Sequence, residues 1–340
     1  MKTVLLPREA SKWIAETSKD VKINDDGVKD LAQVMYECVK NDTYSIKSWK
    51  TEHELNPQTM TEATVDWIFV ADTLNFSFWS ADEQKKYMVR YKGQEYTGYW
   101  SWIAALNRAL DNGIPITDPN YYANLSKEEF AEILKSDSEY EIPMFEERLQ
   151  VLIETGKKLL EKYKGSFVNC IEKCDNCAQS LLNLVVEDFP SYRDEAEYNG
   201  KTVALYKRVQ ILIADIWACF EGKGYGEFHD IDSITMFADY RIPQALVHFN
   251  AMEYSDKLME YLNKGQLMET GDRYEVEIRG CSIWAVELIN KETRKLLDKD
   301  ESTKDSMINA IIIDHYLWDY RRQHASEIEI PFHRIRCLFY

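Results

Sequence analysis

The sequence predicts a mainly α-helical fold with a few short β-strands. Apolar residues recur at the helical period through most of the chain, behind polar start signals. The alternation that is typical of strands is confined to short stretches. With 45% hydrophobic residues among 340, the chain can bury a large core, and no low-complexity linker interrupts it. We therefore expect one domain over residues 1–340, or two helical lobes packed closely together.

The first half of the chain is expected to hold several helices and one hairpin. Helical spacing of apolar residues predicts helices over about 28–38, 61–75, 99–111, 126–134 and 143–163. The fourth begins with Ser126 and Glu129, which have the spacing of a capping box. Residues of high strand propensity on either side of a glycine predict a hairpin over 86–97. The segment 42–57 has no steady period and predicts a loop, in which the pattern alone leaves His53 facing solvent.

Three of the seven cysteines, Cys170, Cys174 and Cys177, have a spacing that also occurs in loops holding iron–sulfur clusters. The same three positions fall on one face of a helix, and the apolar pattern of that face continues to Val185. We therefore favour a buried helical stripe without metal. An odd number of cysteines in apolar surroundings predicts reduced thiols instead of a disulfide framework.

The second half is again read mainly as helices. Apolar spacing predicts helices over about 201–220, 244–252, 255–262 and 305–323. A further helix, which holds Trp284, Val286 and Leu288, is expected after Gly280. Residues 274–279 alternate between polar and apolar and predict a short strand. The glycines at 222–226 follow a helix instead of a strand and lack the spacing of a nucleotide-binding loop, so we interpret them as a bend.

The segment 237–242 carries an unusual concentration of reactive side chains ahead of Pro243. Because proline restricts its own backbone and that of the residue before it, a non-helical approach and then a helix start are expected here. Asp239 lies in this approach. The local pattern leaves two interpretations open for it, a cap of the following helix or a functional carboxylate aimed into a cleft.

A second carboxylate, Asp314, falls on the apolar stripe of the last predicted helix, which includes Ile311 and Trp318. An unpaired ionised group costs several kcal/mol to bury, so this carboxylate requires an arginine, a backbone donor or a ligand as its partner. The arginine candidates are Arg321, Arg322, Arg334 and Arg336. Asp319 lies toward the flank of the same face.

Composition narrows the classes of partner. The formal net charge is -17, from 58 acidic and 41 basic residues, which is unfavourable for gripping a nucleic-acid polymer. A small-molecule substrate is therefore expected. The chain contains no run of eighteen uncharged apolar residues, and its first seven residues are too short for a signal peptide, so we expect a cytosolic protein that neither enters nor crosses a membrane.

Four ordered segments, at 237–244, 275–284, 314–319 and 331–336, resemble the queuosine salvage protein family. The similarity extends to 53–57, 75–79, 96–100 and 206–208, and so spans most of the chain. Members of this family are queuosine 5'-phosphate N-glycosylases that release queuine for reinsertion into tRNA. The resemblance implies a helical fold related to the helix-hairpin-helix DNA glycosylases, acting as a monomer on a free nucleotide and without a metal or redox cofactor.

The resemblance also implies roles for particular residues. Asp239 corresponds to the nucleophile or transition-state stabiliser, and the pocket for queuine and ribose is lined by His53, Phe237, Asp314 and Asp319. Cleavage of an N-glycosidic bond builds positive charge on the ribose, which a carboxylate beside C1' stabilises or captures.

Four further positions follow from the resemblance and the chemistry. His315 stands where an aromatic residue is expected in relatives. The candidates for holding the 5'-phosphate are Lys207, Arg208 and Arg241.

Two alternatives from other classes remain open on the sequence. A non-catalytic helical scaffold would explain the acidity and the nine tryptophans, and it predicts no release of free base. A glycosylase acting on polynucleotides would share the fold, and it predicts oligonucleotide binding with strong salt dependence.

Overall fold

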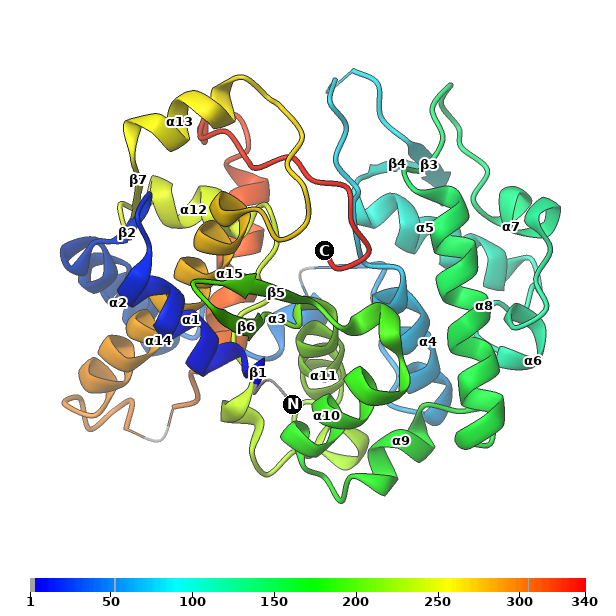
Figure 1. The fold of residues 1–340 in the computed structure, drawn as a ribbon. Helices are drawn as coiled ribbons and strands as arrows, with labels where there is room; N and C mark the ends of the chain where they lie inside the picture. The colour runs from blue at the N-terminus through cyan, green and yellow to red at the C-terminus, as the bar shows by residue number, and fades with distance from the viewer. Residues whose placement is uncertain (1–3, 52, 83, 305) are drawn as a thin grey trace.

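The computed structural model describes residues 4–51, 53–82, 84–304 and 306–340, and it is mainly α-helical, as the sequence predicts (Figure 1). The helices are α1 (Pro7–Thr17), α2 (Asp25–Lys40), α3 (Ser48–Thr51), α4 (Glu62–Thr73), α5 (Tyr99–Asp111), α6 (Pro119–Tyr122), α7 (Lys127–Ile133), α8 (Phe145–Lys162), α9 (Val168–Lys173), α10 (Ala178–Asp188), α11 (Lys207–Cys219), α12 (Ile242–His248), α13 (Asp256–Asn263), α14 (Arg273–Leu297) and α15 (Ala310–Gln323).

The strands are short and pair in small sheets. They are β1 (Val4–Leu5), β2 (Val21–Ile23), β3 (Met88–Tyr91), β4 (Gln94–Thr97), β5 (Glu195–Tyr198), β6 (Lys201–Ala204) and β7 (Met252–Tyr254). One sheet has three strands in the order β1-β6-β5, in which β1 and β6 are parallel and β6 and β5 are antiparallel. The pairs β2–β7 and β3–β4 are antiparallel two-stranded sheets. With so few residues in strands, helix packing supplies most of the core.

Figure 1 shows the helices in two groups, with α11 and the C-terminal segment between them. In one group α14 packs against α1 and α2, and α12 packs against α15. In the other α6 packs against α8, and α4 joins it to α11. One cluster of buried hydrophobic residues includes both groups. A second, smaller cluster brings together Trp79, Tyr240 and Ile335, so three distant segments meet at the junction.

The strongest local signals in the sequence are confirmed. Ser126 and Glu129 form the reciprocal capping box at the start of α7. The predicted hairpin is β3–β4, and its turn residues Lys92 and Gly93 have φ of 47° and 83°. Two consecutive residues at positive φ are what a two-residue turn between twisted strands requires.

The expected helix over 201–220 is wrong at its beginning. Residues 201–204 form β6, which pairs with β5 through a turn at Asn199 and Gly200, both at positive φ. Tyr206, with φ of 49°, separates that strand from α11, which starts at Lys207. An Asn-Gly pair flanked by strand-forming residues is a hairpin signal, and the helical period of the following residues masked it.

The expected strand over 274–279 is also wrong, because these residues are the first turns of α14. Residues 275–283 are all buried, so the alternation of polar and apolar side chains does not separate a core face from a solvent face. Glu275 and Arg279 pair across one helical turn, with 2.9 Å between Oε1 and the guanidinium. Two polar residues of this alternation, Glu275 and Arg279, are therefore buried partners of each other.

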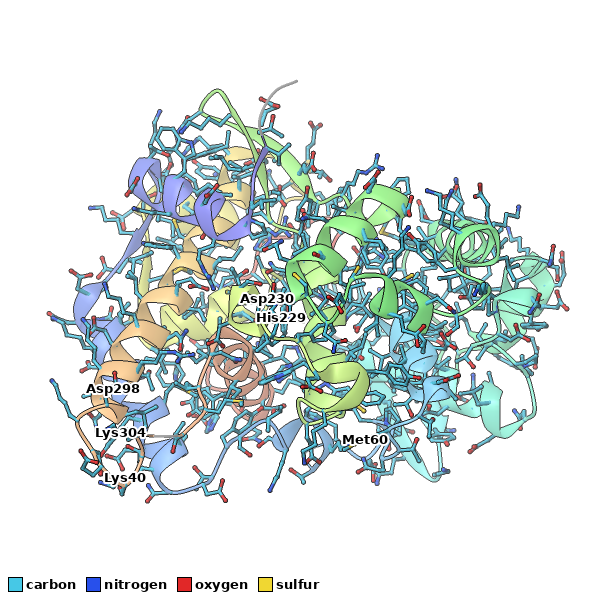
Figure 2. All side chains as sticks on the ribbon, turned by 90° about the horizontal axis from the view of Figure 1, so that it is seen from below. Lys40, Met60, His229, Asp230, Asp298 and Lys304 are labelled. Atoms are coloured by element: carbon cyan, nitrogen blue, oxygen red, sulfur yellow. The ribbon has the colours of Figure 1, made fainter. Side chains whose placement is uncertain are left out.

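The three spaced cysteines do not share one continuous helix. Asp175 and Asn176 have φ of 50° and 55° and separate α9 from α10. Cys177 caps α10 and lies near His229 and Asp230, which Figure 2 shows beside one another. Asp230 accepts the first backbone N–H groups of α10 at 2.6 and 3.1 Å, so helix capping accounts for this group of side chains.

Two C-terminal boundaries also differ from expectation. The helix after Pro243 begins at Ile242 and ends at His248, because residues 252–254 pair with β2. The last helix begins at Ala310, with Asn309 as its cap, and the expected start at Asp305 lies outside the described residues. Within the described ranges, the helices are too short or too polar for any of them to span a bilayer.

Candidate active site

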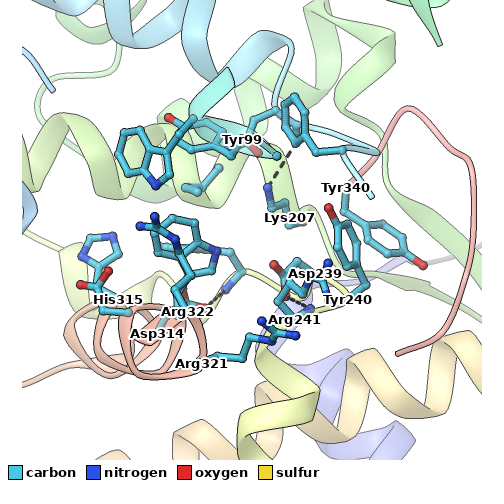
Figure 3. Close-up of a pocket in the computed structure, with 18 of the residues that line it drawn as sticks. Tyr99, Lys207, Asp239, Tyr240, Arg241, Asp314, His315, Arg321, Arg322 and Tyr340 are labelled. Carbon is cyan, nitrogen blue, oxygen red and sulfur yellow. Dashed lines mark hydrogen bonds between the residues drawn. The ribbon is translucent and has the colours of Figure 1, made fainter. Parts of the chain in front are cut away.

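All five residues named as site candidates line one pocket, which lies where the two helix groups meet. They are His53, Phe237, Asp239, Asp314 and Asp319. His53 comes from the loop before α4, Phe237 and Asp239 from the segment before α12, and the other two from α15. Figure 3 shows Asp239 and Asp314 on the same side of this pocket, opposite Lys207 and Tyr99. The structure therefore brings together residues that are up to 266 positions apart in sequence, from 53 to 319.

Asp239 combines the two interpretations that the sequence left open. Its Oδ1 accepts the backbone N–H groups of Arg241 at 2.7 Å and of Ile242 at 2.8 Å, which fixes the carboxylate at the start of α12. Its Oδ2 makes no hydrogen bond to the described residues, and Asp239 is one of the residues that line the pocket. Burial raises the pKa of Asp239, while the N–H of Ile242 and the charge of Lys207 oppose that rise.

Asp314 is 4% exposed, and its partner is a backbone group instead of an arginine. Its Oδ2 accepts the N–H of Phe237 at 2.9 Å, so the expected alternative of an ion pair within the chain is wrong. Burial raises the pKa of Asp314 well above its usual range, and the nearby charge of Asp239 raises it further. Both causes favour the protonated form of this carboxyl group, whose Oδ2 is already engaged as an acceptor.

Asp319 and His53 form a pair at the other side of the pocket. The His53 Nε2 lies 3.0 Å from Asp319 Oδ1, and the Tyr44 hydroxyl donates to Oδ2 at 2.5 Å. Burial alone would raise the pKa of Asp319. The surrounding contacts instead hold this pKa below its usual value, and the hydrogen bond from His53 is the largest of them. The sequence pattern alone predicts that His53 faces solvent. This prediction is wrong, because the centroid of its ring lies 4.6 Å from that of Trp100 and 5.7 Å from that of Trp318.

Aromatic side chains form much of the remaining wall. Phe237 is buried and lies 5.8 Å from the ring of His315, measured between centroids. The Nε2 of His315 lies 3.5 Å from Oδ1 of Asp215, and neither atom has a hydrogen-bond partner among the described residues. Flat rings and a few fixed polar groups are the usual composition of a site for a small planar ligand.

The three basic residues expected as candidates for holding the 5'-phosphate do not all lie at the pocket. Lys207 and Arg241 line the pocket, whereas Arg208 does not. The Arg208 guanidinium is buried against backbone carbonyls of Thr73 and Ser191, so this candidate is wrong on geometry. Burial lowers the pKa of Lys207, and its Nζ donates to the carbonyl of Asn75 at 3.3 Å.

Among the charged residues that line the pocket, three were not anticipated from the sequence as site residues, namely Asp215, Arg321 and Arg322. Asp215 stands in an otherwise apolar turn of α11, which is the same signal that singled out Asp314. The two arginines follow the last apolar turn of α15, where exposed basic residues are ordinary. No local pattern distinguishes them.

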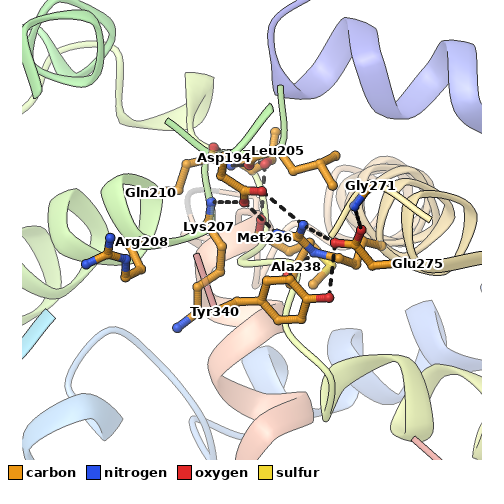
Figure 4. Close-up of polar contacts among 12 residues, drawn as sticks. Asp194, Leu205, Lys207, Arg208, Gln210, Met236, Ala238, Gly271, Glu275 and Tyr340 are labelled. Carbon is orange, nitrogen blue, oxygen red and sulfur yellow. Dashed lines mark hydrogen bonds and ion pairs between the residues drawn. The ribbon is translucent and has the colours of Figure 1, made fainter. Parts of the chain in front are cut away.

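A buried ionic network behind the pocket holds its two main segments in place (Figure 4). The guanidinium of Arg279 donates to the carbonyl of Ala238 at 2.8 Å and to Asp194 at 2.5 and 3.0 Å. Asp194 also accepts the N–H of Lys207 at 3.1 Å. Glu275 accepts a further hydrogen bond from the Arg279 guanidinium at 2.9 Å. Arg279 therefore positions the residue next to Asp239 and, through Asp194, the start of α11.

Comparison with known proteins identifies the family. Residues 55–340 match the family model described as queuosine salvage protein. The chain belongs to the queuosine salvage protein family. The resemblance seen in the sequence is thereby confirmed, and it extends over the pocket and the network behind it.

Curated relatives cover nearly the full length of this queuosine salvage protein family member. A Bos taurus protein is 52% identical over 341 residues, covering all of both chains. A Schizosaccharomyces pombe protein is 40% identical, covering 97% of this chain and 98% of its own. A Sphaerobacter thermophilus protein is 35% identical, covering 97% and 96%. Each of these relatives is named queuosine 5'-phosphate N-glycosylase/hydrolase.

Proposed function

We propose that this protein hydrolyses the N-glycosidic bond of queuosine 5'-phosphate and releases queuine for salvage into tRNA. The other product is ribose 5-phosphate. The relatives' names give the substrate class, and one observation carries the chemistry: Asp239 presents a free carboxylate oxygen to the pocket while backbone donors hold the other. A carboxylate fixed in this way is suited to a cationic transition state at C1'.

Asp239 is proposed as the nucleophile or transition-state stabiliser. Its Oδ2 faces C1' of the ribose as the bond to the base breaks, and it either stabilises the positive charge or forms a glycosyl ester. The base leaves with the bonding electron pair. Water then supplies a hydroxyl group to C1', and the remaining proton of that water goes to the base. Two backbone N–H groups hold the carboxylate before the charge develops, so little reorganisation is needed.

Asp314 is proposed to assist the departing base. Queuine is a 7-deazaguanine and has no N7 to protonate, so help for the leaving group has to come through another edge of the base. A protonated Asp314 can donate from its free oxygen to an acceptor on the base, because Phe237 N–H already occupies the other oxygen. Two carboxyl groups kept in different protonation states by their surroundings are a common acid–base arrangement.

The remaining candidates are proposed to bind the base. Phe237 supplies an apolar face for the ring, and the ionised Asp319 accepts hydrogen bonds or attracts the ammonium group on queuine. His53 holds that carboxylate in place. No metal or redox cofactor is required for hydrolysis by this route.

We also propose that the protein acts as a cytosolic monomer with one domain, on the free nucleotide, with a fold related to the helix-hairpin-helix DNA glycosylases. The net charge of -17 favours a free nucleotide over a nucleic-acid polymer as the substrate. A glycosylase of polynucleotides predicts oligonucleotide affinity that falls steeply with salt. A non-catalytic scaffold predicts no release of base at all.

Mass spectrometry of the products from queuosine 5'-phosphate and from queuosine, side by side, tests the proposal. We expect stoichiometric queuine and ribose 5-phosphate from the nucleotide. Absence of queuine with the folded wild-type protein would overturn the proposed activity. Release from an oligonucleotide at a comparable rate would favour the polynucleotide alternative.

A further inference from the structure

Five consecutive backbone carbonyls, those of residues 73–77, each accept a hydrogen bond from a cationic side chain. These residues end α4 and begin the loop after it, and we call them the wall segment because Asn75, Phe76 and Ser77 line the pocket. Carbonyls at the end of a helix have no partner within the helix and require one elsewhere. The donors are Arg208 to Thr73, Arg148 to both Leu74 and Phe76, Lys207 to Asn75, and Arg336 to Ser77.

Two of these donors, Arg148 and Arg208, are buried cations without a counter-ion. Arg148 is 0% exposed and Arg208 is 1% exposed, and neither forms an ion pair with a carboxylate of the described residues. Arg279, which is 2% exposed, has two such partners. Both unpaired guanidinium groups also stack on the ring of Phe76, at 4.4 and 5.1 Å. Burying a charge in this way is costly, and here both charges are committed to one short stretch of backbone.

The wall segment has a backbone conformation that requires support from outside. Ser77 has φ of 50°, which lies in the left-handed region that residues other than glycine rarely adopt. Its hydroxyl donates to the carbonyl of Cys337 at 3.0 Å. Contacts from α8, α11 and the C-terminal segment therefore fix a conformation that the chain does not favour by itself.

The wall segment in turn holds the ammonium group of Lys207, which is 5% exposed. Its Nζ donates to the carbonyl of Asn75 at 3.3 Å, and this is its one hydrogen bond among the described residues. Burial lowers the pKa of Lys207, and the charges of Asp239 and Asp72 oppose this. Figure 3 shows Lys207 across the pocket from Asp239, and Figure 4 shows the neighbouring Arg208 pointing in another direction. The position of the ammonium group therefore depends on the Asn75 carbonyl.

We propose that Arg148 and Arg208 are positioning residues for the proposed hydrolysis, because they fix the wall segment that holds the Lys207 ammonium group across the pocket from Asp239. The inference rests on the proposed function, which makes Asp239 the reacting carboxylate. Neither arginine lines the pocket, so neither contacts the substrate. Both act on the chemistry through Lys207.

The consequence for Asp239 follows from the charges around it. Burial raises the pKa of Asp239, and the charge of Lys207 opposes this rise. The other charged groups that face Asp239 are Arg241 at the start of α12 and Asp314 on α15, and neither is hydrogen-bonded to the wall segment. The phenol of Tyr240 stays neutral, because burial raises its pKa. Loosening the wall segment should therefore raise the pKa of Asp239 further.

The acid limb of kcat/KM for queuosine 5'-phosphate tests this link. R148M removes the donors to two carbonyls of the wall segment, and the midpoint of the limb should rise by about half a pH unit or more. R148K keeps the charge but replaces a fork of donors with one nitrogen, so it should give a smaller rise.

L152A is the matched control, because Leu152 is fully buried one turn further along α8 and takes no part in these hydrogen bonds. Its lost packing should lower the unfolding midpoint without moving the acid limb. A wild-type limb in folded R148M would overturn the proposal, and so would an equal rise in L152A. If R148M does not fold, R148K decides by the same criterion.

A second readout needs no turnover. In protein labelled with ¹³C at the lysine Cε atoms, the resonance of Lys207 is assigned by its loss in K207M. It should shift in R148M and keep its wild-type position in L152A, because only R148M frees the ammonium group. An unchanged resonance in R148M would contradict positioning whether or not the protein releases queuine. Absence of queuine release by the wild-type protein would overturn the proposed function separately.

Discussion

The side chain of Asp314 accepts the backbone N–H of Phe237 at 2.9 Å, across 77 residues of sequence. This single bond joins the last helix to the segment that carries Asp239. It satisfies one oxygen of a carboxyl group that is 4% exposed, and burial together with the charge of Asp239 raises the pKa of that group. Burial raises the pKa of Asp239 as well, but there the N–H of Ile242 and the charge of Lys207 oppose the rise.

The first prediction is a bell-shaped dependence of kcat/KM on pH. The proposed mechanism requires ionised Asp239, so activity should fall as the pH drops through the raised pKa of that group. The proposed mechanism also requires protonated Asp314, so activity should fall as the pH rises through that group's raised pKa. Initial rates of queuine release across the stable pH range measure both limbs. In D314N, whose amide donates without titrating, the alkaline limb should be flattened, and an unchanged limb would contradict the assigned role.

The second prediction concerns Asp239 itself. D239N retains an oxygen that accepts the N–H groups of Arg241 and Ile242, so the fold should be kept. It lacks the negative charge, and turnover should fall by about a thousandfold or more. Single-turnover release of queuine and thermal unfolding measure the two effects. D298N, at an exposed carboxylate after α14, is the control. Near wild-type turnover in D239N would exclude this residue from the chemistry.

The third prediction tests the network behind the site. R279M should lower the free energy of unfolding by about 3–5 kcal/mol, because it leaves the buried carboxylates of Asp194 and Glu275 without their cation. R294M removes an exposed guanidinium that pairs with Asp232, and it should cost about 1 kcal/mol or less. Chemical denaturation of both variants makes the comparison. Equal losses would show that the network contributes little.

The fourth prediction concerns acid stability. Burial, together with the charge of Arg279, lowers the pKa of His333 to about 3. The unfolded chain takes up this proton near pH 6.5, so the stability contributed by neutral His333 is complete above that pH and is lost as the pH falls. Between pH 6.5 and 4.5 the loss is at most about 2–3 kcal/mol.

The variant H333Q isolates this contribution, because glutamine can still donate to the Tyr340 hydroxyl that His333 contacts at 3.1 Å. Its free energy of unfolding should decline less than that of the wild-type protein over the same pH interval. Parallel declines in the two proteins would show that His333 does not carry the effect.

Local interactions explain which elements were predictable. The capping box of α7 and the turn of β3–β4 depend on residues within three positions of each other, and both were anticipated. The start of α14 is wrongly predicted as a strand, because its polar residues are buried and do not mark a solvent-facing side. Arg279 pairs with Asp194, which is 85 positions away, and the periodicity of a single segment does not encode such a partner.

By itself, the sequence determined that the protein is mainly helical, that Asp314 needed a partner and that the chain resembles one family. Those conclusions depend on helical period, on the cost of burying charge and on ordered motifs. Only the tertiary structure decided the partners: Phe237 for Asp314 and His53 for Asp319. Each contact joins segments brought together by packing, and packing between helices leaves no local trace in the chain.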